Sequence, residues 1–307
     1  MVHNLNLQEM LELWGCGSQL SEVSQKLNID LSYSPLNFDQ FQSVILTNIK
    51  ALESNLSQTG PGRQPDWESG WGSNLEKFNA SGDIEDTVPG YFEKSSVIRW
   101  KQKFIQPHDL NTEKNLLSIL VDSLLLKFGK HADSIYEFGC GTGWHLFRLR
   151  THFPKTKLVG LDWTKQSQEL IRNYAMSRHD KELFGQNFDF FTPPPQGMIV
   201  ERKSVFLTVA SLEQTHKNFS KFLDFILKSK PELIINIEPI GEFLDSNNLL
   251  DLLSLKYFEK RNYLSGFYGA LKALEEQGLI KIHDARRSYL GSLFIDGYSI
   301  IVWSPID

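Results

Sequence analysis

The chain has 307 residues, of which 41% are apolar and 22% charged, and its formal net charge is −5. This balance predicts a soluble globular protein, and the absence of a lysine- and arginine-rich block in the sequence disfavours nucleic acid as the main partner. Only Cys16 and Cys140 are present, which excludes a disulfide framework and a four-cysteine zinc site and favours a cytoplasmic location. No membrane contact is expected, since no apolar run approaches a membrane span, and the first ten residues lack the pattern of a secretion signal.

Residues 1–110 are predicted to form an extension of the main domain. Residues 1–56 are expected to be helical, and their clearest apolar stripe has helical spacing at Phe38, Phe41, Ile45, Ile49, Leu52 and Leu56. Such a helix either caps the main domain or forms a homodimer interface. Residues 57–110 are rich in Gly, Pro, Ser and Asp and are predicted to be irregular. Their tryptophans Trp67 and Trp71 indicate either an aromatic lid over a site or a packed connector.

Residues 111–307 alternate predicted helices and apolar strands. The strands are expected at 134–138, 157–162, 183–191, 204–212 and 232–240, followed by two helices at 246–260 and 264–277 and a hairpin of 280–290 with 298–305. Apolar strands separated by amphipathic helices predict a parallel sheet covered on both faces, and the hairpin adds an antiparallel strand. The expected fold is therefore α/β, with a doubly wound seven-stranded mixed sheet.

A glycine-rich turn follows the first of these strands, with Gly139, Gly141 and Gly143 at alternate positions. A strand–turn–helix unit of this kind presents backbone N–H groups to a ligand at the carboxyl edge of the sheet. Trp144 stands where a dinucleotide fingerprint needs a small residue. Glu137 would repel a pyrophosphate but attract an amine or a sulfonium. The residues therefore favour a cationic adenosine ligand without phosphates.

The segment 137–143, EFGCGTG, resembles the acidic-x-Gly-x-Gly-x-Gly motif of class I, Rossmann-like S-adenosylmethionine-dependent methyltransferases, and the resemblance extends over about 112–303. It implies that S-adenosyl-L-methionine is the cofactor. Its methionine part would lie on the turn, Asp162 would bind the ribose, Trp163 would face the adenine, and Asp189 would accept from the adenine amino group. The cofactor residues expected from the resemblance are Glu137, Phe138, Gly139, Cys140, Gly141, Gly143, Asp162, Trp163, Asp189, Phe190 and Ala210, with Arg99 and Tyr91 reaching the cofactor from the N-terminal side.

The acceptor is expected beyond the fourth and fifth strands of the sheet. The candidate catalytic residues are Glu213, His216 and His145, because a hydroxyl acceptor must lose a proton to a base. The candidate substrate-binding residues are Glu238, Arg261, Tyr263, Tyr268 and Trp71. Each has a structural alternative, such as a helix-start carboxylate for Glu213 or a loop histidine for His216. No cluster with metal-ligand spacing is evident in the sequence, so no metal is expected.

The resulting hypothesis is a methyltransferase directed at oxygen, because the nitrogen-directed NPPY or DPPY type of motif is absent where residues 210–213 read ASLE. The acidic balance favours a small-molecule acceptor. A sugar hydroxyl and the carboxylate of a small peptide-derived natural product both remain open. The alternatives are a non-catalytic interaction protein that binds the cofactor and a nicotinamide-dependent oxidoreductase, against which Trp144 and Glu137 argue.

Overall fold

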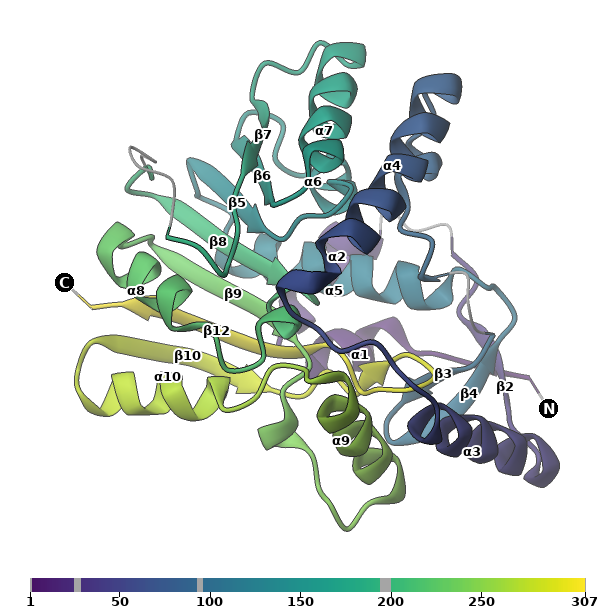
Figure 1. The fold of residues 1–307 in the computed structure, drawn as a ribbon. Helices are drawn as coiled ribbons and strands as arrows, with labels where there is room; N and C mark the ends of the chain where they lie inside the picture. Colours follow the sequence, from purple (N-terminus) through teal and green to yellow (C-terminus); the bar gives the residue numbers. More distant parts are fainter. Residues whose placement is uncertain (1, 25–28, 93–95, 194–199, 307) are drawn as a thin grey trace.

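The computed structural model describes residues 2–24, 29–92, 96–193 and 200–306. Its largest element is a seven-stranded sheet in the order β10-β12-β9-β8-β5-β6-β7 (Figure 1). Its strands are β5 (Ser134–Phe138), β6 (Lys157–Asp162), β7 (Leu183–Asn187), β8 (Ser204–Val209), β9 (Leu233–Glu238), β10 (Ile280–Arg286) and β12 (Ser299–Pro305). Strands β5 to β9 are parallel, and β12 lies antiparallel between β9 and β10. The predicted α/β fold with a seven-stranded mixed sheet is confirmed.

Helices cover both faces of this sheet because its strands are apolar on both sides. On β5, Ile135 packs toward one face, whereas Tyr136 and Phe138 pack toward the other, as the alternation of side chains along a strand requires. The first face is covered by α5 (Thr112–Phe128), α6 (Trp144–Leu149) and α7 (Lys165–Ser177), and the second by α8 (Ser220–Ser229) and α10 (Phe267–Glu276). Helix α9 (Leu249–Arg261) precedes α10, so the two helices predicted after the fifth strand are both present.

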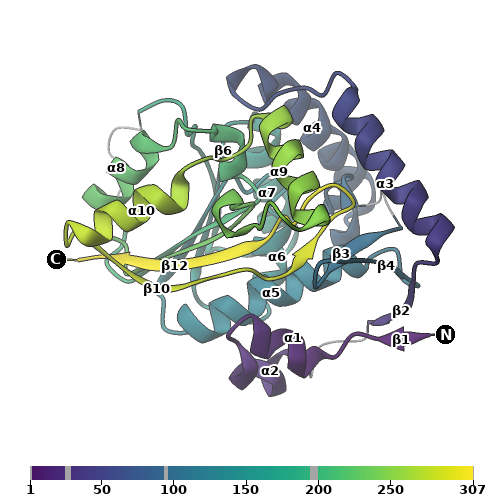
Figure 2. The ribbon, with the colours of Figure 1, turned by 90° about the horizontal axis from the view of Figure 1, so that it is seen from below.

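The prediction that residues 1–56 are helical is only partly correct. They contain α1 (Leu7–Leu13), α2 (Leu20–Ser24) and α3 (Phe38–Glu53), but also β1 (His3–Asn4) and β2 (Ser32–Pro35). These two strands belong to a second, five-stranded sheet in the order β1-β2-β4-β3-β11, which lies beside α3 in both ribbon views (Figures 1 and 2). Its other strands are β4 (Lys103–Pro107), β3 (Ile98–Trp100) and β11 (Leu290–Gly291). The strands of two to five residues are too short to show a periodic apolar pattern.

The prediction of an irregular segment over 57–110 is wrong at its centre, where α4 (Gln64–Ser81) forms. A proline in its first turn and Gly82 at its C-terminal cap, with φ of 70°, define the ends of this helix. Trp71, Leu75 and Phe78 recur at helical spacing and are buried. The ring centroid of Phe78 lies 5.7 Å from that of Tyr174 on α7, so α4 packs onto the main domain.

Helix α3 carries the apolar stripe noted in the sequence and begins with a capping box of Asn37 and Gln40. It packs against α9, yet Phe38 remains 72% exposed and Ile49 39% exposed. The helix therefore covers part of the main domain with one side, and a homodimer interface on its other side stays a prediction.

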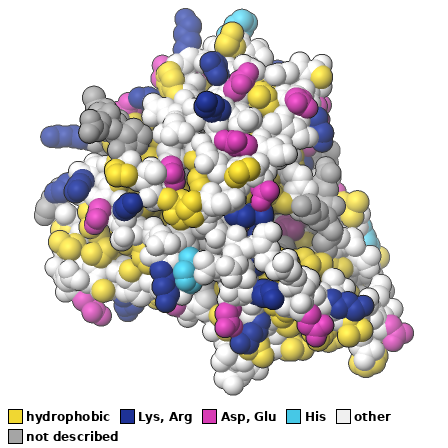
Figure 3. Space-filling model, viewed as in Figure 1, with side chains coloured by type: hydrophobic (Ala, Val, Ile, Leu, Met, Phe, Trp, Pro, Cys, Tyr) yellow, Lys and Arg dark blue, Asp and Glu magenta, His cyan; other side chains and the backbone are white. Residues whose placement is uncertain are grey.

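The face of the molecule seen in Figure 3 carries lysine, arginine and acidic side chains interspersed with one another rather than in blocks of one sign. Within the described ranges, none of the helices combines the length and the hydropathy that crossing a bilayer requires.

Candidate functional site

A cavity opens at the carboxyl ends of β5, β6 and β8. Strand β5 is the point at which the strand order reverses, and ligands of doubly wound sheets bind at such a switch point. Of the residues that the sequence predicts for the site, the cavity wall contains Trp71, Tyr91, Glu137, Gly139, Cys140, Gly141, His145, Asp162, Trp163, Phe190 and Ala210.

The glycine turn forms the floor of this cavity. Gly139, Gly141 and Gly143 all have left-handed backbone conformations, with φ of 69°, 55° and 81°. The backbone N–H of Gly139 donates to the Leu161 carbonyl on β6 at 2.6 Å, which ties the turn to the neighbouring strand. A Cβ on Gly139 would lie 2.4 Å from the Cβ of Ser211, so the turn also packs tightly against the segment after β8. Only glycine satisfies both the conformation and the space at this position.

Asp162 ends β6 and is 5% exposed. Its Oδ1 accepts from the backbone N–H and the hydroxyl of Thr164, each at 2.9 Å, and its Oδ2 accepts from the Gly141 N–H at 3.1 Å. Burial raises the pKa of this carboxyl to about 6, against the lowering effect of these hydrogen bonds. Asp162 is therefore held rigidly at the cavity wall beside the glycine turn.

Glu137, on β5, is 1% exposed and lines the cavity. Its Oε2 has no hydrogen-bond partner among the described residues. Burial, and then the nearby Asp162 carboxylate, raise its pKa to about 8. A buried carboxyl oxygen without a donor indicates that a ligand supplies one.

His145 opens α6 and also lines the cavity. Burial, followed by the Arg148 charge, lowers its pKa to about 3, so the imidazole is neutral under physiological conditions. Its Nδ1 is buried and finds no partner within the described part of the chain. His145 can therefore exchange a hydrogen bond with a ligand but carries no charge.

Trp67 and Trp71, predicted to belong either to an aromatic lid or to a packed connector, both lie on α4. The two indole rings stack with centroids 5.2 Å apart, and both line the cavity. A Cβ on Gly141 would come within 2.9 Å of the Trp71 ring, which therefore lies directly over the glycine turn. Gln64 Nε2 donates to the Trp163 carbonyl at 3.3 Å and links the start of α4 to the segment after β6. Trp71, predicted to bind substrate, thus lies beside the glycine turn, and its role toward a ligand stays a prediction.

Glu238 does not line the cavity, although it was expected to bind substrate. It is fully buried at the end of β9, and its carboxylate accepts from the backbone N–H groups of Ser211, Leu212 and Glu213 at 3.0–3.2 Å. Through these hydrogen bonds, the Glu238 carboxylate fixes the position of the segment after β8. Glu238 is thus a positioning residue for the cavity wall.

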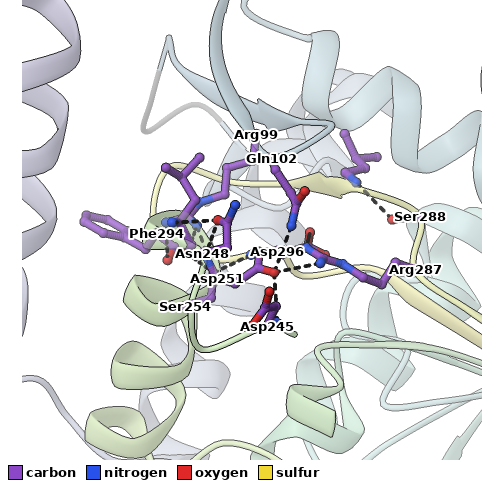
Figure 4. Close-up of polar contacts among 12 residues, drawn as sticks. Arg99, Gln102, Asp245, Asn248, Asp251, Ser254, Arg287, Ser288, Phe294 and Asp296 are labelled. Carbon is purple, nitrogen blue, oxygen red and sulfur yellow. Dashed lines mark hydrogen bonds and ion pairs between the residues drawn. The ribbon is translucent and has the colours of Figure 1, made fainter. Parts of the chain in front are cut away.

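Arg99 is the clearest correction among the expected cofactor residues. It lies on β3, is 2% exposed, and donates to Ser254 Oγ at 2.9 Å and to the Phe294 carbonyl at 2.9 Å. It also donates to the Leu250 carbonyl. Figure 4 shows its guanidinium directed at α9 and the segment after β11. Its role is to join β3 to these elements, because its Nη1 and Nη2 both donate there and it does not line the cavity.

The remaining predicted residues lie outside the cavity wall. Phe138 belongs to the core, and Gly143 caps α6. His216 Nδ1 lies 3.0 Å from the Tyr263 carbonyl, Tyr268 packs edge-to-face against Phe243, and Arg261 donates to the Ser57 carbonyl. Asp189 accepts from the Phe191 N–H at 2.8 Å. Glu213 is buried behind Gln214, whose side-chain amide donates to it at 3.0 Å.

Several lining residues were not among the predicted site residues, namely Trp67, Pro89, Thr142, Trp144, Phe188, Phe191, Val209, Ser211 and Gln214. Most of them are next to a predicted residue in the sequence. This adjacency is the sequence feature from which they could have been predicted. No group of three or more potential metal ligands occurs in the ranges that the structure describes.

No protein-family model matches the chain, and no curated protein matches its sequence. Solved structures resemble it more distantly. The plantazolicin methyltransferase BpumL is 12% identical, covering 81% of this chain and 100% of its own, with a TM-score of 0.44. The pyocyanin biosynthetic protein PhzM is 12% identical over 88% of this chain and 74% of its own, with a TM-score of 0.45. Human N-acetylserotonin methyltransferase is 12% identical over 96% and 69%, with a TM-score of 0.43. Activity therefore has to be inferred from the cavity itself.

Proposed function

We propose that this chain is an S-adenosylmethionine-dependent methyltransferase that methylates an oxygen of a small molecule. The observation that carries the proposal is the pairing of a left-handed glycine turn with two buried carboxyl groups, Glu137 and Asp162, on one cavity wall. A nucleotide with phosphates would be repelled by this pair, whereas an ammonium or sulfonium group would be attracted.

The residues present fit this cofactor. Glu137 Oε2 is buried without a donor, and a cationic amine would supply one. Asp162 Oδ2 accepts from the Gly141 N–H at 3.1 Å, and its second lone pair can accept from a ribose hydroxyl. Trp163 and Phe191, with ring centroids 5.8 Å apart, provide a wall for the adenine.

The bound cofactor would supply a methyl group already activated by its sulfonium. The protein then has to orient the acceptor in line with that methyl and exclude water. The Trp67–Trp71 pair on α4 covers the turn and performs the exclusion. The neutral His145, in the tautomer that carries its proton on Nε2, can accept a hydrogen bond from an acceptor hydroxyl at Nδ1 and orient the oxygen.

Glu213 is the better base of the three candidates. Burial, and next the Glu238 charge, raise its pKa to about 8, which brings it near the pH at which a proton acceptor works best. His145 has too low a pKa, and His216 faces Tyr263. Glu213 stands behind Gln214, so a side-chain rotation of Gln214 is part of this role.

The donor assignment is tested by calorimetry with S-adenosylhomocysteine and with NAD. We expect saturable binding of S-adenosylhomocysteine and none of NAD. Binding of NAD alone would assign the cavity to an oxidoreductase, and binding of neither would end the proposal. Methyl transfer from labelled cofactor to an acceptor then distinguishes an enzyme from a protein that only binds the cofactor.

Asp162→Ala is expected to weaken S-adenosylhomocysteine binding by about 1–3 kcal/mol, because a hydrogen bond to a charged acceptor is lost. Calorimetry measures the change. The matched control is Asp180→Ala, since Asp180 accepts from Arg150 at 2.7 Å outside the cavity. An unchanged affinity in a folded Asp162 variant would remove it from the ribose role.

Cofactor binding is expected to become tighter as the pH rises from 6 to 8. Glu137 has a pKa of about 8 in the free protein, so it is largely protonated at pH 6. A bound cation stabilises the ionised form and lowers this pKa, so that binding releases a proton. The affinity should rise by up to about tenfold per pH unit in this window and level off above it.

Proton release is measured by calorimetry in two buffers of different ionisation enthalpy. Glu137→Gln should bind more weakly and should lose the part of the pH dependence between 7 and 8. The contribution of Asp162, whose pKa is about 6, should remain. An identical pH profile in the two proteins would show that Glu137 does not face the cation.

A further inference from the structure

The proposed cofactor ends in an amino acid, so the cavity has to bind a carboxylate as well as an ammonium group. Glu137 can bind the ammonium group. Arg99, the arginine expected at the cofactor, donates to α9 and to the segment after β11 instead. None of the cavity-lining residues that the structure describes is lysine or arginine. The carboxylate therefore has to be bound by uncharged donors on this wall.

Thr142 and Trp144 carry side-chain donors of this kind. Thr142 lies in the glycine turn and Trp144 begins α6, and both side chains are more than nine-tenths buried and line the cavity. Thr142 Oγ1 and Trp144 Nε1 have no hydrogen-bond partner among the described residues. An indole N–H can only donate, so Trp144 requires an acceptor, and a buried donor without one indicates that a ligand supplies it.

Two cations stand against the Trp144 ring. Lys114 Nζ, in the first turn of α5, lies 5.3 Å from the ring centroid, and the guanidinium carbon of Arg148, on α6, lies 5.6 Å from it. They pair with Glu85 and Asp122 and do not line the cavity themselves. A cation close to the ring draws electron density from the indole and makes its N–H a stronger donor. The Trp144 N–H is therefore better suited to an anionic acceptor than to a neutral one.

The other unpartnered atoms of the wall have different uses. Glu137 Oε2 and Gln214 Oε1 are acceptors, and His145 Nδ1 is available to the hydroxyl of the methyl acceptor. Trp67 Nε1 is a second indole donor without a partner in the described part of the chain. It lies on the same side of α4 as Gln64, which donates to the Trp163 carbonyl, so it faces the adenine end of the cavity.

The chemistry of an amino acid restricts where its two charged groups can be bound. The ammonium and carboxylate groups are attached to one carbon atom, so their partners must lie close together on the protein. Glu137 lies on β5 just before the glycine turn, Thr142 lies within the turn, and Trp144 follows it directly. The turn therefore brings an acceptor for the ammonium group and donors for the carboxylate to one part of the wall.

We propose that Trp144 Nε1 and Thr142 Oγ1 bind the carboxylate of the cofactor's methionine part, while Glu137 binds its ammonium group. This inference rests on the proposed methyltransferase function and assigns to that site two residues with no role in it so far. It also gives the site a specificity, because a nucleoside that keeps the amine but lacks the carboxylate leaves both donors unpaired.

The test compares three ligands that differ only at the amino-acid end. They are S-adenosylhomocysteine, its decarboxylated form 5′-(3-aminopropyl)thioadenosine, and its deaminated form 5′-(3-carboxypropyl)thioadenosine. Calorimetry measures their binding to the full chain. We expect the decarboxylated form to bind at least tenfold more weakly than S-adenosylhomocysteine. Equal affinities for these two ligands would overturn the inference.

Two variants identify the donors. Trp144→Phe keeps a ring beside Lys114 and Arg148 but removes the N–H, and Thr142→Val removes the hydroxyl at nearly constant volume. They should weaken the binding of S-adenosylhomocysteine at least fivefold and threefold, respectively, and weaken the deaminated form similarly. Their affinity for the decarboxylated form should stay within twofold of that of the unmodified chain, because that ligand lacks the group that the donors bind.

The matched control is Trp67→Phe, which makes the same change at the other unpartnered indole of the described wall. It should change the affinities for S-adenosylhomocysteine and for the decarboxylated form by the same factor. If Trp144→Phe also weakened both ligands equally, or weakened neither, Trp144 would not bind the carboxylate. Should Trp144→Phe fail to fold, Thr142→Val gives the same comparison. Failure of the unmodified chain to bind S-adenosylhomocysteine would instead refute the proposed function, and this inference with it.

Discussion

Asp251→Ala is expected to lower the free energy of unfolding by about 3–5 kcal/mol, the cost of removing one member of a buried ion pair. Asp251, in the first turn of α9, is 1% exposed and accepts from Arg287 through both oxygens, at 2.7 and 2.8 Å. Gln102 and the Asp245 N–H also donate to it, each at 3.0 Å. Figure 4 shows these donors converging on one carboxylate. Urea denaturation measures the change.

The size of this effect follows from charge balance. Arg287 also pairs with Asp296 at 2.6 Å, and the charges of Asp296 and Asp251 both act on Arg99. Two acids and two arginines are therefore buried together, and removal of Asp251 leaves a net positive charge out of water. The control is Glu259→Ala, which breaks an exposed pair with Lys256 at 3.0 Å and should cost less than about 1 kcal/mol. A loss of similar size in both variants would contradict the argument.

This network also shows why Arg99 could not be placed from the sequence. Its partners lie on α3, on α9 and near residue 294, and the nearest of the α9 partners is 151 residues away along the chain. A lone arginine beside aromatic residues gives no indication of which distant carbonyls will receive its hydrogen bonds. The prediction that Glu238 binds substrate was wrong for a related reason. Its position at a strand end was predictable, but its use by three backbone N–H groups of the neighbouring strand's loop was not.

The predicted residues that line the cavity have signals that are local in the sequence. Gly139 and Gly141 come just after β5 and Asp162 ends β6, and parallel strands bring their carboxyl ends together. For helix α4, in contrast, the local composition led to a wrong prediction. Its glycine and serine content suggested a loop, whereas the spacing of Trp67, Trp71 and Phe78 was already helical. Burial of that stripe against α7 outweighs the low helix propensity of the intervening residues.

Gly139→Ala should both destabilise the protein and weaken cofactor binding. An alanine at φ of 69° costs about 1–2 kcal/mol, and a Cβ 2.4 Å from that of Ser211 adds an overpacking cost of about 1–3 kcal/mol. The displaced Ser211 would lose its 2.8 Å bond to the Phe138 carbonyl, and the cavity floor would move with it. We expect the free energy of unfolding to fall by about 2–5 kcal/mol and the affinity for S-adenosylhomocysteine to fall at least tenfold.

A second substitution separates the steric clash with Ser211 from the backbone strain at position 139. Ser211→Gly removes the atoms that the new methyl group meets, so the Gly139→Ala/Ser211→Gly double variant should regain the overpacking part of the loss but not the part due to φ. Gly70→Ala is the control, because Gly70 lies in α4 with nothing within 4 Å of an added Cβ, and it should be neutral or stabilising by up to about 1 kcal/mol. If the double variant were no more stable than Gly139→Ala alone, contact with Ser211 would not be what requires glycine there.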